Sequence, residues 1–178
     1  MVIRKFLQLN TQSSAKKLTK KVPIGYDQAK SVGLLFTIED LVKHKAIKKF
    51  IKVLEDEGKQ VQVLTFLPKG KENHEFLFDF IAENDFNFWG KLLNRTAIRF
   101  IENKFDFLLH LDRAQTDFID NILSKSQAKC RVGILKTDRN EEPEIKYYEI
   151  IIHPDENETL ENNLNEIHHY IKKILSNA

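Results

Sequence analysis

The fold of this chain is indicated most clearly by FDFLLHLD at residues 105–112, an apolar run that ends in an acidic residue. A segment whose apolar residues have helical spacing follows at 115–128, and a second apolar run, CRVGIL, occupies residues 130–135. Strand, polar tip, helix and strand form the unit of a parallel sheet, and ligands usually bind such sheets at the carboxyl ends of the strands. The pattern therefore predicts a parallel sheet with Asp112 at its ligand-binding edge.

The same alternation extends over most of the chain. Residues 31–37 (SVGLLFT) are an apolar run of the kind found in strands covered on both faces. Residues 61–67 (VQVLTFL) are predicted to form the next strand, and residues 38–56 between the two have helical spacing. Further strands are predicted at 76–81 and 147–152. We therefore predict an α/β fold, with a three-layer, Rossmann-like, mostly parallel sheet of about five or six strands and helices on both faces.

The chain has 178 residues, the length of one domain. A proline and a glycine near residue 24 punctuate the sequence, so we predict an N-terminal arm or short helix, residues 1–21, followed by one α/β domain, residues 22–178. No apolar run approaches the roughly 20 residues that span a bilayer. The single cysteine is typical of a reducing compartment. These features predict a cytoplasmic protein.

Charge is distributed unevenly, although the net charge is only +2. The first 21 residues contain no acidic residue, and we predict that their basic residues bind a polyanion. This candidate set consists of Arg4, Lys5, Lys16, Lys17, Lys20 and Lys21. The partner is a protein or RNA assembly, an anionic membrane is a weaker alternative, and a disordered or self-packed terminus remains open. The sequence has no motif that reads DNA sequence and does not indicate an oligomeric state.

Polar residues also follow the predicted strands and form a candidate ligand site. Thr37 ends the first strand, Glu39 and Asp40 follow it, and Asp112 ends the strand at 105–112. Because the carboxyl ends of parallel strands share one edge, we expect these four residues to converge there. A simpler interpretation, which we favour, is that Asp40 and Asp112 each cap a helix and Glu39 is solvated.

Several kinds of chemistry lack support in the sequence. Neither a dinucleotide-binding nor a P-loop glycine pattern is present, and the acids at residues 39 and 40 would repel a phosphate. The histidines lack metal-ligand spacing, and no nucleophile motif occurs. We predict that His110 and Cys130 are core residues and that the lysines at 43, 45, 48, 49 and 52 form a solvated helix face. No catalytic residue, metal site or cofactor is predicted.

The aromatic residues between 84 and 91 suggest two alternatives, a binding lip that stacks on bases or a loop packed onto the sheet edge. We favour the packed loop.

Two resemblances follow from these residues. Residues 105–112 with 129–134 resemble a segment in the N-terminal domain of heptosyltransferase-like glycosyltransferases, which need a second Rossmann-like domain for the sugar nucleotide. This chain has no room for that domain and lacks the glycine-rich acceptor loop, so no catalytic residue is transferred. The whole chain, including GLLFT at 33–37, FWG at 88–90, Asp112 and RVG at 131–133, is similar to a family of small uncharacterised bacterial proteins. That resemblance implies the fold and no particular activity.

These observations favour a non-catalytic α/β binding module that docks to a larger partner, such as RNA or the ribosome, through its basic arm. The alternative is a degenerate glycosyltransferase-like domain that binds a sugar or nucleotide at the carboxyl ends of the strands.

Overall fold

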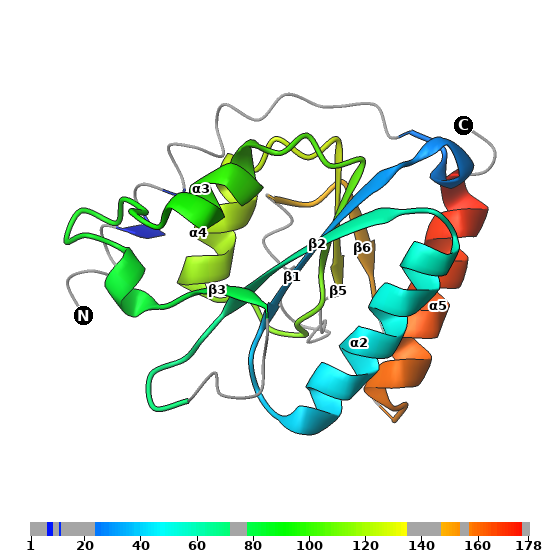
Figure 1. Ribbon diagram of the computed structural model, residues 1–178, viewed down its shortest axis with the longest axis horizontal. Helices are drawn as coiled ribbons and strands as arrows, with labels where there is room; N and C mark the ends of the chain where they lie inside the picture. The colour runs from blue at the N-terminus through cyan, green and yellow to red at the C-terminus, as the bar shows by residue number, and fades with distance from the viewer. Residues whose placement is uncertain are drawn as a thin grey trace, which may run out of the picture.

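A computed structural model of the protein contains one six-stranded sheet in which every strand pair is parallel (Figure 1). The structure describes residues 7–8, 11, 24–71, 78–134, 147–153 and 157–175. The strands are β1 (Ser31–Thr37), β2 (Gln60–Phe66), β3 (Asp79–Ile81), β4 (Phe107–His110), β5 (Cys130–Ile134) and β6 (Ile150–Ile152). The helices are the short η1 (Tyr26–Gln28) and η2 (Glu83–Asp85), and α2 (Leu41–Asp56), α3 (Arg95–Glu102), α4 (Asp117–Lys125) and α5 (Leu160–Leu175).

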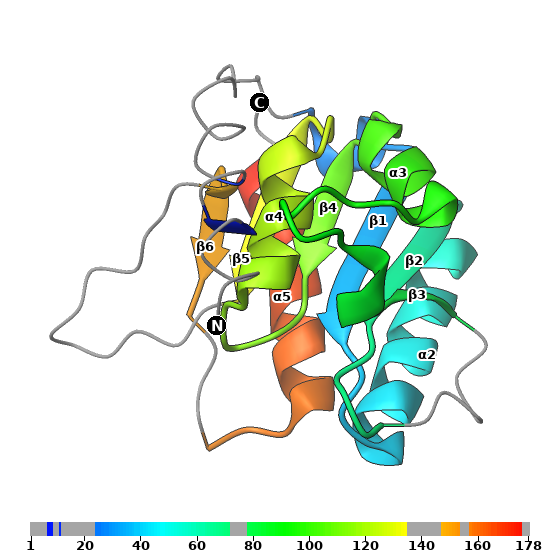
Figure 2. The same cartoon turned by 90° about the vertical axis from the view of Figure 1, so that its left-hand side faces the viewer.

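The strands lie in the order β3-β2-β1-β4-β5-β6, which Figure 2 shows from the side of α3 and α4. Helices α2 and α5 cover one face of the sheet, and α3 and α4 cover the other (Figure 1). Each face has its own apolar core: Ile47 and Leu54 of α2 lie in one, whereas Ile119 and Leu123 of α4 lie in the other. The prediction of a three-layer, Rossmann-like α/β fold is therefore confirmed.

The helices begin at side chains that satisfy free backbone N–H groups. Asp40 accepts from the Lys43 N–H at the start of α2, Asn94 accepts from Thr96 and Ala97 at α3, and Thr116 accepts from the Ile119 N–H at α4. Asp, Asn and Thr are all favoured at this position because their side chains are short acceptors. The prediction that Asp40 caps a helix is confirmed, whereas the prediction that Asp112 caps the following helix is wrong, because Thr116 occupies that position.

The element bounds differ from the prediction mainly at the edges of the sheet. The strand predicted at 76–81 is described as β3, which begins at Asp79, and residues 72–77 lie outside the described part. The strand predicted at 147–152 begins only at Ile150. None of the helices within the described ranges is long and apolar enough to cross a membrane.

Candidate functional site

The two middle strands, β1 and β4, lie side by side. The helices that follow them, α2 and α4, lie on opposite faces of the sheet. The connection after β1 runs through α2 to β2, and the connection after β4 runs through α4 to β5. The strand order therefore reverses between β1 and β4, and open α/β sheets generally bind ligands in the crevice beyond the carboxyl ends at such a point. A hollow of about 510 Å³ occupies this position.

The hollow is lined by the residues that follow β1 and β4, by the start of α2 and by residues near the start of α5. We call it the strand-end crevice. Its polar lining consists of Thr37, Glu39, Asp40, Lys43, Asp112, Arg113, Thr116 and Glu158. The four residues predicted as a strand-end site, Thr37, Glu39, Asp40 and Asp112, are thus brought to one hollow by the fold.

Asp112 is the most enclosed acid of the crevice, with 5% of its surface exposed. Its carboxylate accepts the Thr37 N–H at 2.8 Å, the Thr37 hydroxyl at 2.7 Å and the Lys43 ammonium at 2.6 Å. The His110 ring nitrogen Nε2 lies 3.4 Å away. Because these contacts engage both carboxylate oxygens, Asp112 fixes the end of β1 and the start of α2 against the end of β4.

Burial alone would raise the pKa of the Asp112 carboxyl. The hydrogen bond from His110 and the positive charges near the carboxylate act in the opposite direction, and together they lower its pKa below the ordinary value. Asp112 is therefore an ionised acceptor at neutral pH and holds no proton to donate to a ligand.

Lys43 is the residue of this site that the sequence prediction placed wrongly. It was assigned to a solvated helix face, but only 7% of its surface is exposed. Its ammonium donates to Asp112 and also to Glu39, both at 2.6 Å. Glu39 and Lys43 are four residues apart, a spacing at which opposite charges often pair. This spacing could have indicated the Glu39–Lys43 pair from the sequence. The buried pair to Asp112, by contrast, required knowledge of the strand order.

His110 is fully buried behind Asp112, as predicted for a core histidine. Its Nδ1 lies 2.7 Å from the Tyr148 hydroxyl, and the two rings are stacked. Both ring nitrogens are satisfied when Nε2–H donates to Asp112 and Nδ1 accepts from Tyr148. The Tyr148 ring lies against Gly133 of β5, where a Cβ atom would approach it to 2.7 Å. This contact explains why a glycine is needed at that position of the strand.

The exposed part of the crevice is acidic. Glu39 has 58% of its side chain exposed, and Glu158 is also exposed. In total the lining contains four carboxylates, of Glu39, Asp40, Asp112 and Glu158, and two cations, of Lys43 and Arg113. Within the described ranges, no group of three or more His, Cys, Asp or Glu side chains is placed to hold a metal ion. The lining therefore suits a ligand with hydrogen-bonding groups or a positive charge better than a ligand with a phosphate.

The other predicted features lie elsewhere. All six basic residues of the proposed polyanion-binding arm fall outside the described part of the chain. Leu7 is buried in the core on the α4 side, and the Thr11 hydroxyl accepts from Asn121 of α4 at 3.0 Å. Residues 7 and 11 therefore contact the domain.

Cys130 is buried, and burial raises the pKa of its thiol to about 12, as expected for an inert core residue.

The aromatic loop is divided between core and surface. Phe86 is buried and lies next to Phe118, whereas Phe88 and Trp89 are exposed, Trp89 to 64%. The favoured prediction that the loop packs onto the sheet edge therefore holds for Phe86 and is wrong for Phe88 and Trp89.

The sheet order and the crevice at the strand ends define the class: this is a Rossmann-like α/β protein with an acidic pocket at the point where the strand order reverses. Within that class, the chain belongs to DUF6913, a family of unknown function whose family model matches residues 3–174. Neither the curated proteins nor the solved structures contain a match.

Proposed function

We propose that this protein is a binding module whose strand-end crevice takes a small, hydroxyl-rich ligand without a phosphate, such as a sugar. One observation supports this function most directly. The hollow at the reversal of strand order is lined by the buried Lys43–Asp112 ion pair and by the exposed carboxylate of Glu39. This position is the usual ligand site of open α/β sheets.

The side chains of the crevice match the donors and acceptors of a sugar. The Lys43 ammonium has three N–H donors, and Glu39 and Asp112 engage two of them, so one is left for a ligand hydroxyl. The exposed Glu39 carboxylate accepts hydrogen bonds from hydroxyl groups, and the Thr37 hydroxyl, which donates to Asp112, keeps lone pairs for a further donor. Because a hydroxyl group both donates and accepts hydrogen bonds, the hydroxyl groups of a sugar could bond to Lys43, Glu39 and Thr37.

The charge of the lining supports a neutral or cationic ligand over a nucleotide. Four carboxylates against two cations would repel a phosphate in the partly enclosed hollow. The alternative of a degenerate glycosyltransferase-like domain, which rests on residues 105–112 with 129–134, is compatible with a sugar ligand. On this proposal the protein retains the binding of a sugar without the transfer reaction.

An NMR titration of the ¹⁵N-labelled chain tests this function. The probes are a set of neutral hexoses and heptoses, the same sugars as 1-phosphates, and ATP. We expect a neutral sugar to shift the backbone amides of Thr37, Lys43 and Arg113, and the phosphorylated compounds to leave them unchanged. Lys43→Met should abolish the response, whereas Lys45→Met, an exposed lysine of the same helix, should preserve it. The proposal fails if no sugar shifts these amides at millimolar concentration, or if the phosphates bind more tightly.

We also propose that the basic residues among 1–21 dock the module to a polyanionic partner such as RNA. Six basic residues without an acidic one support this second function. Leu7 and Thr11, which lie between these basic residues in the sequence, contact the domain near α4.

A further inference from the structure

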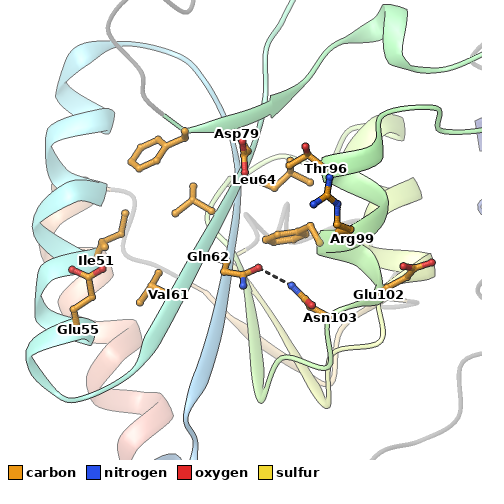
Figure 3. A pocket seen from close by; sticks show the side chains of 13 residues that line it. Ile51, Glu55, Val61, Gln62, Leu64, Asp79, Thr96, Arg99, Glu102 and Asn103 are labelled. Carbon is orange, nitrogen blue, oxygen red and sulfur yellow. Dashed lines mark hydrogen bonds between the residues drawn. The ribbon is translucent and has the colours of Figure 1, made fainter.

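The edge strand β3 covers only part of its neighbour β2. Its residues pair with Leu64, Thr65 and Phe66, and no strand in the described ranges pairs with residues 60–63 on that side. A hollow of about 730 Å³, larger than the strand-end crevice, lies along this uncovered half of β2. Figure 3 shows it between α2 and α3, with β2 along its base. We call it the edge groove.

The backbone of β2 presents hydrogen-bonding groups to this groove. The Gln60 N–H donates to the Lys30 carbonyl, on the β1 side, and the Leu67 N–H donates to the Ile81 carbonyl, on the β3 side. In a parallel sheet the N–H and C=O of one residue point to the same side, and the side alternates along the strand. The backbone groups of Val61 and the N–H of Val63 therefore point into the groove, over a length of roughly 13 Å for four residues.

The two sides of the groove differ in polarity. Toward α2, the side chains of Ile51, Val61, Val63 and Phe78 are half-buried and pack on the apolar core of that face. Toward α3, the lining is more polar: Asn103 donates to Gln62 at 2.7 Å, and Arg99 and Thr96 also line the groove. The apolar residues of this side, Leu64 and Phe100, are buried in the core. Figure 3 shows these groups on opposite sides of β2. An added strand would meet this difference with alternating apolar and polar residues, because successive side chains of a strand point to opposite faces.

The ionised groups of the groove are mainly acidic. Glu55 stands on the α2 side, Asp79 at the start of β3 and Glu102 on the α3 side, with Arg99 as the cation among them. All four side chains are exposed. The groove therefore favours a segment with basic residues.

We propose that the edge groove binds an extended segment of a partner protein, which adds as a strand beside residues 60–63. Its apolar side chains face α2, its polar side chains face α3, and a Lys or Arg lies at its ends. Strand addition uses main-chain hydrogen bonds for affinity and alternating side-chain contacts for specificity. A strand suits this site better than a helix, because the groove runs along the edge of the sheet between helices of both faces. Exposed edges of this kind are normally covered or blocked in proteins.

The alternation along β2 provides an internal control for the test. The probe is the acetylated, amidated hexapeptide Lys-Val-Thr-Val-Thr-Lys, added to the full ¹⁵N-labelled chain. We expect the amide hydrogens of Val61 and Val63 to exchange about tenfold more slowly, as expected for a newly formed hydrogen bond. The amides of Gln60 and Gln62, which face β1, should keep their rates. Equal protection of all four amides, or protection of none, overturns the proposal.

Altered peptides and variants separate strand addition from non-specific binding. A peptide with proline at its second threonine should bind about tenfold more weakly, since it lacks one backbone donor. Val61→Pro removes a donor on the protein side and should have a similar effect. If that variant does not fold, the double variant Glu55→Lys, Glu102→Lys tests the proposal instead. It should bind a peptide with Asp at both ends more tightly than the Lys-ended peptide, whereas the wild type should prefer the Lys-ended one. Unchanged preference, or equal binding of the proline peptide, refutes the proposal.

Discussion

Asp112→Asn is the substitution that tests the base of the strand-end crevice most directly. The change preserves the size of the side chain and one acceptor oxygen but removes the negative charge. The Lys43 ammonium then loses one of its two carboxylate partners, and the Thr37 N–H and hydroxyl compete for the remaining oxygen. The amide group also adds two donors to a position where the Thr37 N–H, the Thr37 hydroxyl and the Lys43 ammonium all donate to the wild-type carboxylate.

The expected loss of stability can be worked out from these contacts. Removing one partner of a buried ion pair costs about 3 to 5 kcal/mol, because an uncompensated charge is left behind. Lys43 keeps its contact with the exposed Glu39, which moderates the loss. We therefore expect the free energy of unfolding to fall by about 3 kcal/mol at pH 7.

The pH dependence has a definite sign. The pKa of Asp112 is lowered in the folded protein, so the carboxyl stabilises the fold above its unfolded pKa of about 3.9. This contribution is lost as the pH falls through the folded value. Because the asparagine does not titrate, the difference between wild type and variant should be full at pH 7 and should shrink below about pH 4.

Urea unfolding followed by circular dichroism at pH 7 and at pH 3 measures both quantities. Asp40→Asn is the matched control, because asparagine caps a helix about as well as aspartate, and its stability should change by less than about 0.5 kcal/mol. A loss below about 1 kcal/mol for Asp112→Asn at pH 7, or a difference that does not shrink with acid, would refute the reasoning.

Three further predictions concern other parts of the molecule. Burial raises the pKa of Asp106, but hydrogen bonds from Lys129 and the backbone lower it to about 2 overall. Asp106→Asn should therefore lower the free energy of unfolding in urea by about 2 kcal/mol at pH 7, and by progressively less between about pH 4 and pH 2. Gly133→Ala should lower the Tm by several degrees in a calorimetric scan, because the new Cβ atom lies 2.7 Å from the Tyr148 ring; an unchanged Tm contradicts that contact. Neutralising the basic residues of the arm to glutamine, which leaves the buried Leu7 in place, should reduce retention on immobilised single-stranded RNA and its salt dependence, whereas elution at the wild-type salt concentration would contradict a role in polyanion binding. The residues to be changed are Arg4, Lys5, Lys16, Lys17, Lys20 and Lys21.

The sequence was sufficient for the middle of the sheet, because β1, β4 and β5 are largely apolar runs, which are typical of strands covered on both faces. It was also sufficient for the Asp40 cap and for the buried state of His110, which depend on neighbouring residues. The convergence of Thr37, Glu39, Asp40 and Asp112 followed from parallel strands alone. These features are local, or are consequences of the strand direction.

The errors concern contacts between residues far apart in the chain. Asp112 was expected to cap the next helix, but Thr116 is better placed, and Asp112 contacts β1 instead. Lys43 was expected in solvent, since lysines recur along that helix, yet it alone among the five predicted surface lysines is buried. Both errors have one cause: the periodicity of a single segment does not show that β4 lies beside β1.

The neighbouring positions of β1 and β4 also explain how the residues of the proposed binding site are held in place. Asp106, just before β4, accepts the N–H groups of Lys30 and Ser31 at the start of β1. Asp112, just after β4, accepts the N–H of Thr37 at its end. The two carboxylates thus fix β1 at both ends against β4, and binding should require little movement of the backbone. Since the oxygens of Asp112 are engaged, a ligand would contact Lys43 and Glu39, and Asp112 would act by positioning that lysine.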